Sequence, residues 1–165
     1  AEFGKGTLYN YFKNKEEIYL GILEDLFSKN MMVMEQLDNE NSTFKGFIEA
    51  YTRQMVEFCV NDRATFNVMV RMRTSPSGDV LIRSSEKLNE LHESGHYLFK
   101  RKIESAIKNK EIRDINPESL ILIMHSLIYP YMHFLLTHNN NYKEIDFTKE
   151  SELINSVFFN GILNK

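Results

Sequence analysis

Cysteine, glycine and proline are scarce in this chain of 165 residues, and each shortage excludes a kind of structure. The single cysteine, Cys59, rules out an internal disulfide bond. Seven glycines and three prolines allow few turns, so the elements should be long. The β-branched runs and frequent turns of a sheet protein are missing as well. We therefore predict an all-α fold.

The chain also lacks a strong charge of either sign, a signal-peptide pattern and a clean hydrophobic span. Twenty basic residues against 23 acidic ones give a net charge of −3, so any contact with nucleic acid must be local. The longest apolar run, LILIMHSLIYPYMHFLL, is slightly short for a membrane span and is interrupted by histidine, serine and proline. A hydrophobic content of 42% is enough for the core of one domain. We expect a soluble, cytoplasmic protein without a membrane partner.

Apolar residues recur at helical spacing along most of the chain. Asn14 suits the N-cap of the first helix, because acidic Glu16 and Glu17 follow it. Asn116 suits another N-cap, with Pro117 as the first helical residue. The pattern predicts six helices, at about 14–37, from Ser42 or Thr43 through Cys59, 62–72, 79–110, 117–136 and 149–163.

The segment GKGTLYNYFKNKEEI, residues 4–18, concentrates three lysines and two tyrosines before its first acid. Backbone N–H groups at the start of a short helix allow close approach to phosphate, and a lysine at the start of the next helix can reach another phosphate. The segment resembles the second half of the helix-turn-helix of the TetR (AcrR-like) family of bacterial transcriptional regulators. The resemblance implies DNA contacts at Lys5, Gly6, Thr7, Tyr9, Asn10, Tyr11 and Lys15.

The same resemblance implies a domain plan. Residues 1–38 would be an incomplete helix-turn-helix region, with the recognition helix at about 5–11 and a connecting helix at 15–37. The family places two further helices before this point, so we expect upstream sequence that this chain lacks. Residues 39–165 would form a helical effector-binding and dimerisation domain. The partners implied are palindromic operator DNA, a small apolar effector that releases a repressor, and a second copy held through about 117–136 and 149–163.

His92, Glu93 and His96 form an H-E-x-x-H pattern, which in zinc peptidases supplies two metal ligands and a general base. Phe99 stands where the longer form of that motif requires glycine. A small zinc metallopeptidase, or a helical interaction module without DNA binding, therefore remain alternatives. We favour histidines that are structural or line a cavity, and we predict no enzymatic activity, no metal and no cofactor.

Several aromatic, methionine and histidine residues would suit an apolar pocket with a few polar groups. Cys59, by contrast, is expected to be a small core residue. The pocket residues predicted are Phe58, Phe66, Met69, Met72, His92, His96, Tyr97, Met124, His125 and Tyr129.

Overall fold

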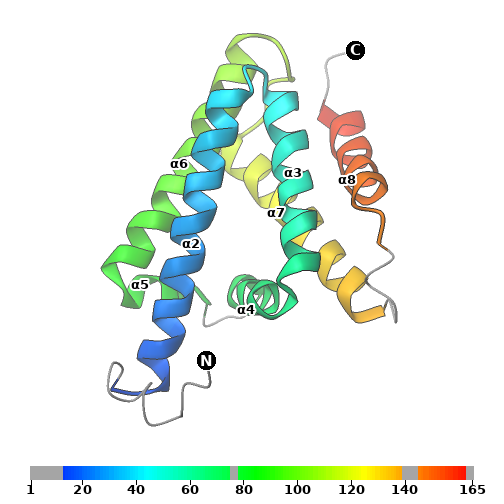
Figure 1. Cartoon of the computed structure of the whole chain (residues 1–165). Helices are drawn as coiled ribbons and strands as arrows, with labels where there is room; N and C mark the ends of the chain where they lie inside the picture. Colours follow the sequence, from blue (N-terminus) through cyan, green and yellow to red (C-terminus); the bar gives the residue numbers. More distant parts are fainter. Residues whose placement is uncertain (1–12, 75–77, 139–144, 163–165) are drawn as a thin grey trace.

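A computed structural model describes residues 13–74, 78–138 and 145–162, and these residues contain helices and no strand. The all-α prediction is therefore confirmed for this part of the chain. The helices are α2 (Lys15–Glu40), α3 (Phe44–Asn61), α4 (Arg63–Thr74), α5 (Gly78–Ser84), α6 (Glu86–Lys108), α7 (Pro117–His138) and α8 (Phe147–Ile162) (Figure 1).

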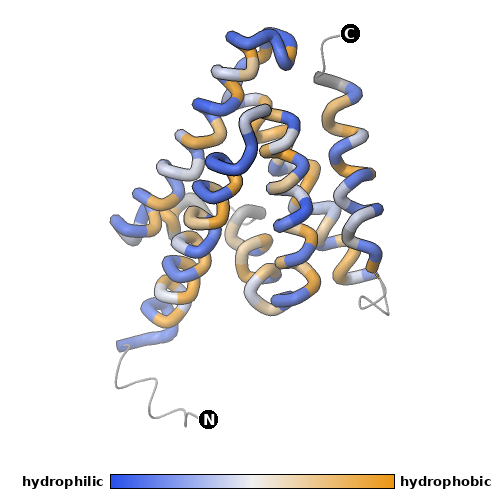
Figure 2. Tube along the Cα trace, turned by 45° about the horizontal axis from the view of Figure 1, so that its top comes forward, coloured by the Kyte–Doolittle hydropathy of each residue, from blue (hydrophilic) through white to orange (hydrophobic). Residues whose placement is uncertain are grey.

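The two longest helices, α2 and α6, lie side by side along one flank of the molecule (Figure 1). Helix α3 turns back beside α2, α4 crosses beneath them, and α7 runs behind. Helix α8 covers the outer side of α3. Along most helices, hydrophobic residues recur about once per helical turn, with hydrophilic residues between them (Figure 2). Each helix therefore presents an apolar side to a shared core. The most deeply buried members of this core include Leu23, Phe47, Val56, Phe66, Leu88 and Met132.

Most of the helices begin at a side chain that caps the first turn. Asn14 Oδ1 accepts a hydrogen bond from the Glu17 amide at 2.8 Å, as predicted for α2. Asn116 Oδ1 accepts one from the Ser119 amide at 3.0 Å, and α7 begins at Pro117, also as predicted. Such caps satisfy amides that have no partner within the helix. The other caps are Thr43 for α3, Asp62 for α4, Ser85 for α6 and Asp146 for α8.

The prediction of one long helix over 79–110 is wrong, because the helix is interrupted at Ser85. This residue has an extended backbone, with φ −119° and ψ 120°, and separates α5 from α6. Its hydroxyl accepts a hydrogen bond from the Leu88 amide at 3.2 Å and donates one to Glu24 of α2 at 2.6 Å. The polar contacts of a serine thus compete with helix continuation at this position.

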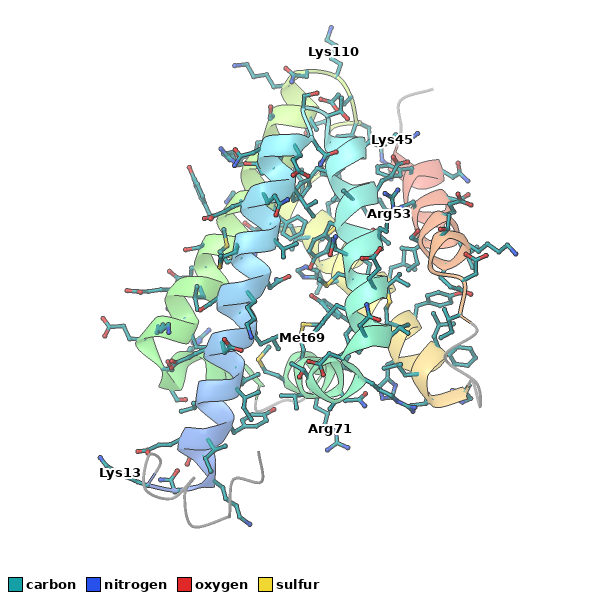
Figure 3. The ribbon with its side chains drawn as sticks, viewed as in Figure 1. Lys13, Lys45, Arg53, Met69, Arg71 and Lys110 are labelled. Carbon is teal, nitrogen blue, oxygen red and sulfur yellow. The ribbon has the colours of Figure 1, made fainter. Side chains whose placement is uncertain are left out.

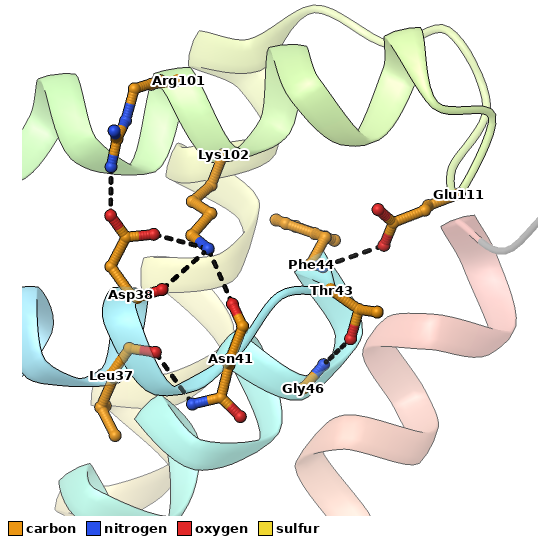
Figure 4. Close-up of polar contacts among 9 residues, drawn as sticks. All are labelled: Leu37, Asp38, Asn41, Thr43, Phe44, Gly46, Arg101, Lys102 and Glu111. Atoms are coloured by element: carbon orange, nitrogen blue, oxygen red, sulfur yellow. Dashed lines mark hydrogen bonds and ion pairs between the residues drawn. The ribbon is translucent and has the colours of Figure 1, made fainter.

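A cluster of charges ties the end of α2 to the middle of α6 (Figure 4). The Asp38 carboxylate accepts hydrogen bonds from Arg101 and, at 2.5 Å, from the Lys102 ammonium. Lys102 also donates to the Asn41 carbonyl at 2.9 Å, in the turn between α2 and α3. Partial burial works to raise the pKa of Asp38, but the two cations outweigh it and hold that pKa below its ordinary value. We call Asp38, Asn41, Arg101 and Lys102 the Asp38 clamp.

Next to the clamp, the end of α6 is linked to the start of α3. The Phe44 amide donates a hydrogen bond to the Glu111 carboxylate at 2.9 Å (Figure 4). Glu111 is placed by a turn in which Lys110 has φ 62° and the Glu111 amide reaches back to the Ala106 carbonyl at 2.9 Å. This left-handed residue and its back-bond are the usual way to end a helix.

Helix α7 is long and apolar enough to cross a membrane by length and composition, and within the described ranges no other helix is. Core helices of globular proteins meet the same criteria, and α7 packs against α3, α4, α6 and α8. It nevertheless leaves large apolar side chains exposed, namely Leu122, Ile123 and Phe134.

Candidate functional site

The start of α2 marks the end of the molecule at which the predicted DNA-contacting segment enters. The Lys13 backbone amide donates a hydrogen bond to the Glu17 carboxylate at 2.6 Å. Lys15, the first helical residue, is exposed. Lys13 and Arg71 both project from this end (Figure 3). The described residues therefore present basic side chains here. The other predicted contacts, Lys5, Gly6, Thr7, Tyr9, Asn10 and Tyr11, lie outside the described residues.

A cavity of about 60 Å³ lies between α2, α3, α6 and α7. Aromatic rings, methionines and histidines form most of its wall, so apolar and polar surface are mixed in it. A Cβ added at Gly95 would lie 3.9 Å from the Met34 side chain, which is an ordinary van der Waals contact. The cavity is lined by Phe27, Asn30, Met31, Met34, Tyr51, Leu91, His92, Gly95, His96, Phe99 and His125.

Three of the predicted pocket residues are histidines, and all three reach this cavity. The His92 ring lies 6.3 Å from that of Phe27, and the His125 ring lies 5.7 Å from that of Phe99, measured between ring centroids. His96 Nε2 lies 2.5 Å from a Glu118 carboxylate oxygen. In the part of the chain that the structure describes, no three His, Cys, Asp or Glu side chains converge as a metal site.

Glu118 lies partly exposed at the edge of the cavity and contacts both His96 and Lys100. Lys100 donates a hydrogen bond to it at 3.0 Å and holds the pKa of the carboxyl below its ordinary value, with His96 acting in the same direction. Glu118 in turn raises the pKa of Lys100. The pair ties α6 to the first turn of α7, so the position of α7 is coupled to the histidine side of the cavity.

A second, larger hollow runs along the opposite side of α2, between α2, α3 and α4. Its volume is about 820 Å³, and its apolar lining is mostly aliphatic. Met69 points into it from α4 (Figure 3). We call it the α2 groove, lined by Ile18, Gly21, Ile22, Asp25, Leu26, Lys29, Asn30, Val33, Gln54, Met55, Phe58, Asp62, Thr65 and Met69.

The predicted pocket residues divide into four sets. His92, His96 and His125 line the cavity, and Phe58 and Met69 line the α2 groove. Tyr97 does not line the cavity: its side chain is 67% exposed on the outside of α6, where it borders a surface hollow together with His92 and His96. Helical spacing places it one position from His96 and turns it outward. The remaining predicted residues, Phe66, Met72, Met124 and Tyr129, are buried in the core.

The prediction missed Asn30, Tyr51 and Leu91. Asn30 had a readable signal, because it is a polar residue on the apolar stripe that also carries Phe27 and Met34. Tyr51 is fully buried with its hydroxyl 3.3 Å from that of Tyr129, a contact between distant segments that no local pattern announces.

No family model matches the chain. A curated relative, the uncharacterized HTH-type transcriptional regulator YhgD of Bacillus subtilis (strain 168), is 25% identical over 124 residues. The match covers 75% of this chain and 63% of the relative, so the chain spans less than two thirds of that protein's length.

Solved structures resemble the chain over almost all of it. The transcriptional regulator FadR from Bacillus subtilis, in complex with stearoyl-CoA, has a TM-score of 0.76 at 19% identity over 96% of this chain and 82% of its own. A regulatory protein in the TetR family from Rhodococcus RHA1 has a TM-score of 0.72 at 16% identity over 96% of this chain and 80% of its own. The chain therefore has the fold of TetR-family regulators.

Proposed function

We propose that this chain is part of a DNA-binding transcriptional regulator, a repressor that binds a palindromic operator as a homodimer and is released by a small, largely apolar effector. The observation that carries the proposal is the course of α2. This single helix begins at Lys15, beside the segment that resembles a recognition helix, and continues unbroken past the cavity and the groove.

Helix α2 gives both sites one rigid element. Phe27, Met31 and Met34 line the cavity from α2, and Phe27 lies about 18 Å along the helix from Lys15 at 1.5 Å per residue. An effector that displaces the cavity side of α2 must also move its first turn. Operator half-sites tolerate little change in the separation of two recognition helices, so a coupling of about 1–3 kcal/mol would be enough for a switch.

Exposed apolar residues on the last two helices support a homodimer. On α7, Leu122 and Phe134 are 67% and 52% exposed, and on α8 Leu153 and Val157 are 50% and 57% exposed. Large apolar surfaces of this kind are usually covered by a partner. A two-fold axis would pair each surface with its own copy, in a four-helix interface built from about 117–136 and 149–163.

The chemistry of the interior supports a small apolar effector. The α2 groove has a mostly apolar wall with isolated polar groups, as small-molecule sites do, and the smaller cavity beside it has a mixed apolar and polar wall. FadR from Bacillus subtilis, which has a similar fold, has been crystallised in complex with stearoyl-CoA. We propose that the protein acts in the cytoplasm, as a regulator and not as an enzyme, with no cofactor and no membrane partner.

Operator binding by the full-length protein tests this function. Replacing Lys15 by Ala should weaken binding to all DNA sequences alike and lower the salt slope by about one unit, because a phosphate contact is lost. Tyr9→Ala should weaken binding as well. Lys45→Ala is the matched control, since Lys45 is exposed at the opposite end of the molecule (Figure 3). Unchanged affinity in both test variants would exclude a DNA role for these residues.

A further inference from the structure

Asn30 is the polar residue that the cavity and the α2 groove share. It lies on α2 between Phe27 and Met34, on the side of the helix that faces the core. Its Oδ1 is buried and has no hydrogen-bond partner among the described residues. Its Nδ2 donates a hydrogen bond to the Met34 sulfur at 3.6 Å.

An amide oxygen in this position needs a donor. Burying a hydrogen-bonding group without a partner is costly, so such groups usually have one in the protein, in water or in a ligand. Exchanging the amide oxygen and nitrogen would not help, because the thioether of Met34 accepts weakly and donates nothing. Both hollows are large enough to hold water or a ligand atom beside Oδ1.

The two hollows differ in size and chemistry. The cavity has room for only a few water-sized atoms, and its wall is aromatic and histidine-rich. The α2 groove is more than ten times larger, with methionine and aliphatic walls. Methionine side chains adapt to flexible apolar chains. An elongated molecule with a compact head and an aliphatic body would fill both spaces.

Building on the proposed function, we propose that Asn30 is the specificity-determining residue for the effector, with Oδ1 accepting a hydrogen bond from a hydroxyl head while an aliphatic body lies in the α2 groove. The effector class is therefore a neutral aliphatic alcohol. The small cavity excludes bulky heads such as a nucleotide.

Charge at the rim of the α2 groove disfavours the entry of an anionic ligand. Asp25 and Asp62 are both exposed at its rim, and the one lysine there, Lys29, is already paired with Asp25 at 2.6 Å. A carboxylate head would also bring no donor to Oδ1. The geometry thus separates an alcohol from the fatty acid of equal length.

The test is calorimetric titration of the full-length protein with three probes of matched length: 1-octanol, its isomer heptyl methyl ether, and octanoate. The ether has the same formula as the alcohol but no donor. We expect the alcohol to bind about tenfold more tightly than the ether, which corresponds to about 1.4 kcal/mol, and octanoate to bind more weakly than the alcohol.

Asn30→Leu should remove the preference for the alcohol over the ether while leaving binding of the ether unchanged. Asn30→Met is a second variant without an acceptor, in case the first folds poorly. Asn39→Leu is the matched control, because Asn39 is an exposed residue on the same helix that does not line the cavity or the groove. The control should retain the tenfold preference.

Equal binding of alcohol and ether, tighter binding of octanoate, or a preference that survives Asn30→Leu would each overturn the inference. Absence of binding by all three probes would also overturn it, because the groove would then not accept an aliphatic chain of this length. Operator binding measured on the same samples distinguishes failure of the alcohol site from failure of the proposed function. If the unmodified protein binds operator but binds alcohol and ether equally, the alcohol site alone is refuted, whereas an unmodified protein that binds no operator refutes the proposed function.

Discussion

Replacing Asp38 by Ala should destabilise the fold by about 2 kcal/mol, chiefly by leaving Lys102 without its carboxylate. Asp38 and Lys102 are largely buried, with side chains 17% and 14% exposed, and lie 2.5 Å apart. A hydrogen bond between charged groups contributes about 1.5–3 kcal/mol. Arg101 is 55% exposed, so its pair with Asp38 should add less than about 1 kcal/mol. The better helix propensity of alanine offsets about 0.5 kcal/mol of the loss.

Urea unfolding followed by circular dichroism measures this loss, and its pH dependence has a definite sign. The pKa of Asp38 is lower in the folded protein than its ordinary value of 3.8. Its contribution to stability is therefore complete above that value and is lost as the pH falls through the folded-state pKa. The gap between wild type and Asp38→Ala should be full at pH 7 and should shrink as the pH falls below about 3.8.

A double-mutant cycle with Lys102→Met isolates the pair, and its coupling energy should be about 1–2 kcal/mol. Arg101→Ala is the control and should cost less than about 1 kcal/mol. The reasoning fails if Asp38→Ala costs no more than Arg101→Ala, or if the gap between wild type and Asp38→Ala is the same at pH 7 and below pH 3.

Three other outcomes can be measured directly. Leu153→Glu should convert the proposed dimer to a monomer in analytical ultracentrifugation with helix content unchanged, and a monomeric wild type at micromolar concentration would contradict that proposal. Gly95→Ala should raise the free energy of unfolding by about 0.5–1 kcal/mol, because the added Cβ makes only ordinary contact with Met34; a loss of stability would show that α2 and α6 lie closer than described. The thiol of Cys59 should resist alkylation at pH 8 in the folded protein and react after denaturation, because burial raises its pKa to about 12; rapid reaction in the folded protein would contradict its burial.

Local chemistry made much of the fold predictable. The apolar stripe of α3 and the caps Asn14 and Asn116 act within one or two turns of the chain, so their structural consequences can be read from neighbouring residues. The break at Ser85 could not be found in this way. The serine lies between two helical patterns, and its hydroxyl is fixed partly by Glu24, which is 61 residues away.

The candidate site was predictable only in part for a similar reason. His92 and His96 stand out in the sequence, and they do reach the cavity. Tyr97 has the same aromatic character, and only its angular position on α6 separates it from them. Asn30 is significant because two hollows meet at its side chain, and that depends on how α3, α4 and α6 pack around α2.

The Asp38 clamp holds the C-terminal end of α2, so a small displacement in the middle of the helix becomes a larger one at its N-terminal end. Lys15 lies about 34 Å from Asp38 along the helix axis, and Phe27 lies about 16 Å from it, at 1.5 Å per residue. If α2 turns as a rigid rod about the clamp, a shift of 1 Å at Phe27 becomes about 2 Å at Lys15, and each degree of rotation moves Lys15 by about 0.6 Å. Two protomers that turn in opposite directions double that change across a dimer. In the proposed regulator, a clamp that fixes one end of a helix would thereby set how far the DNA-contacting end moves when a small molecule binds in the core.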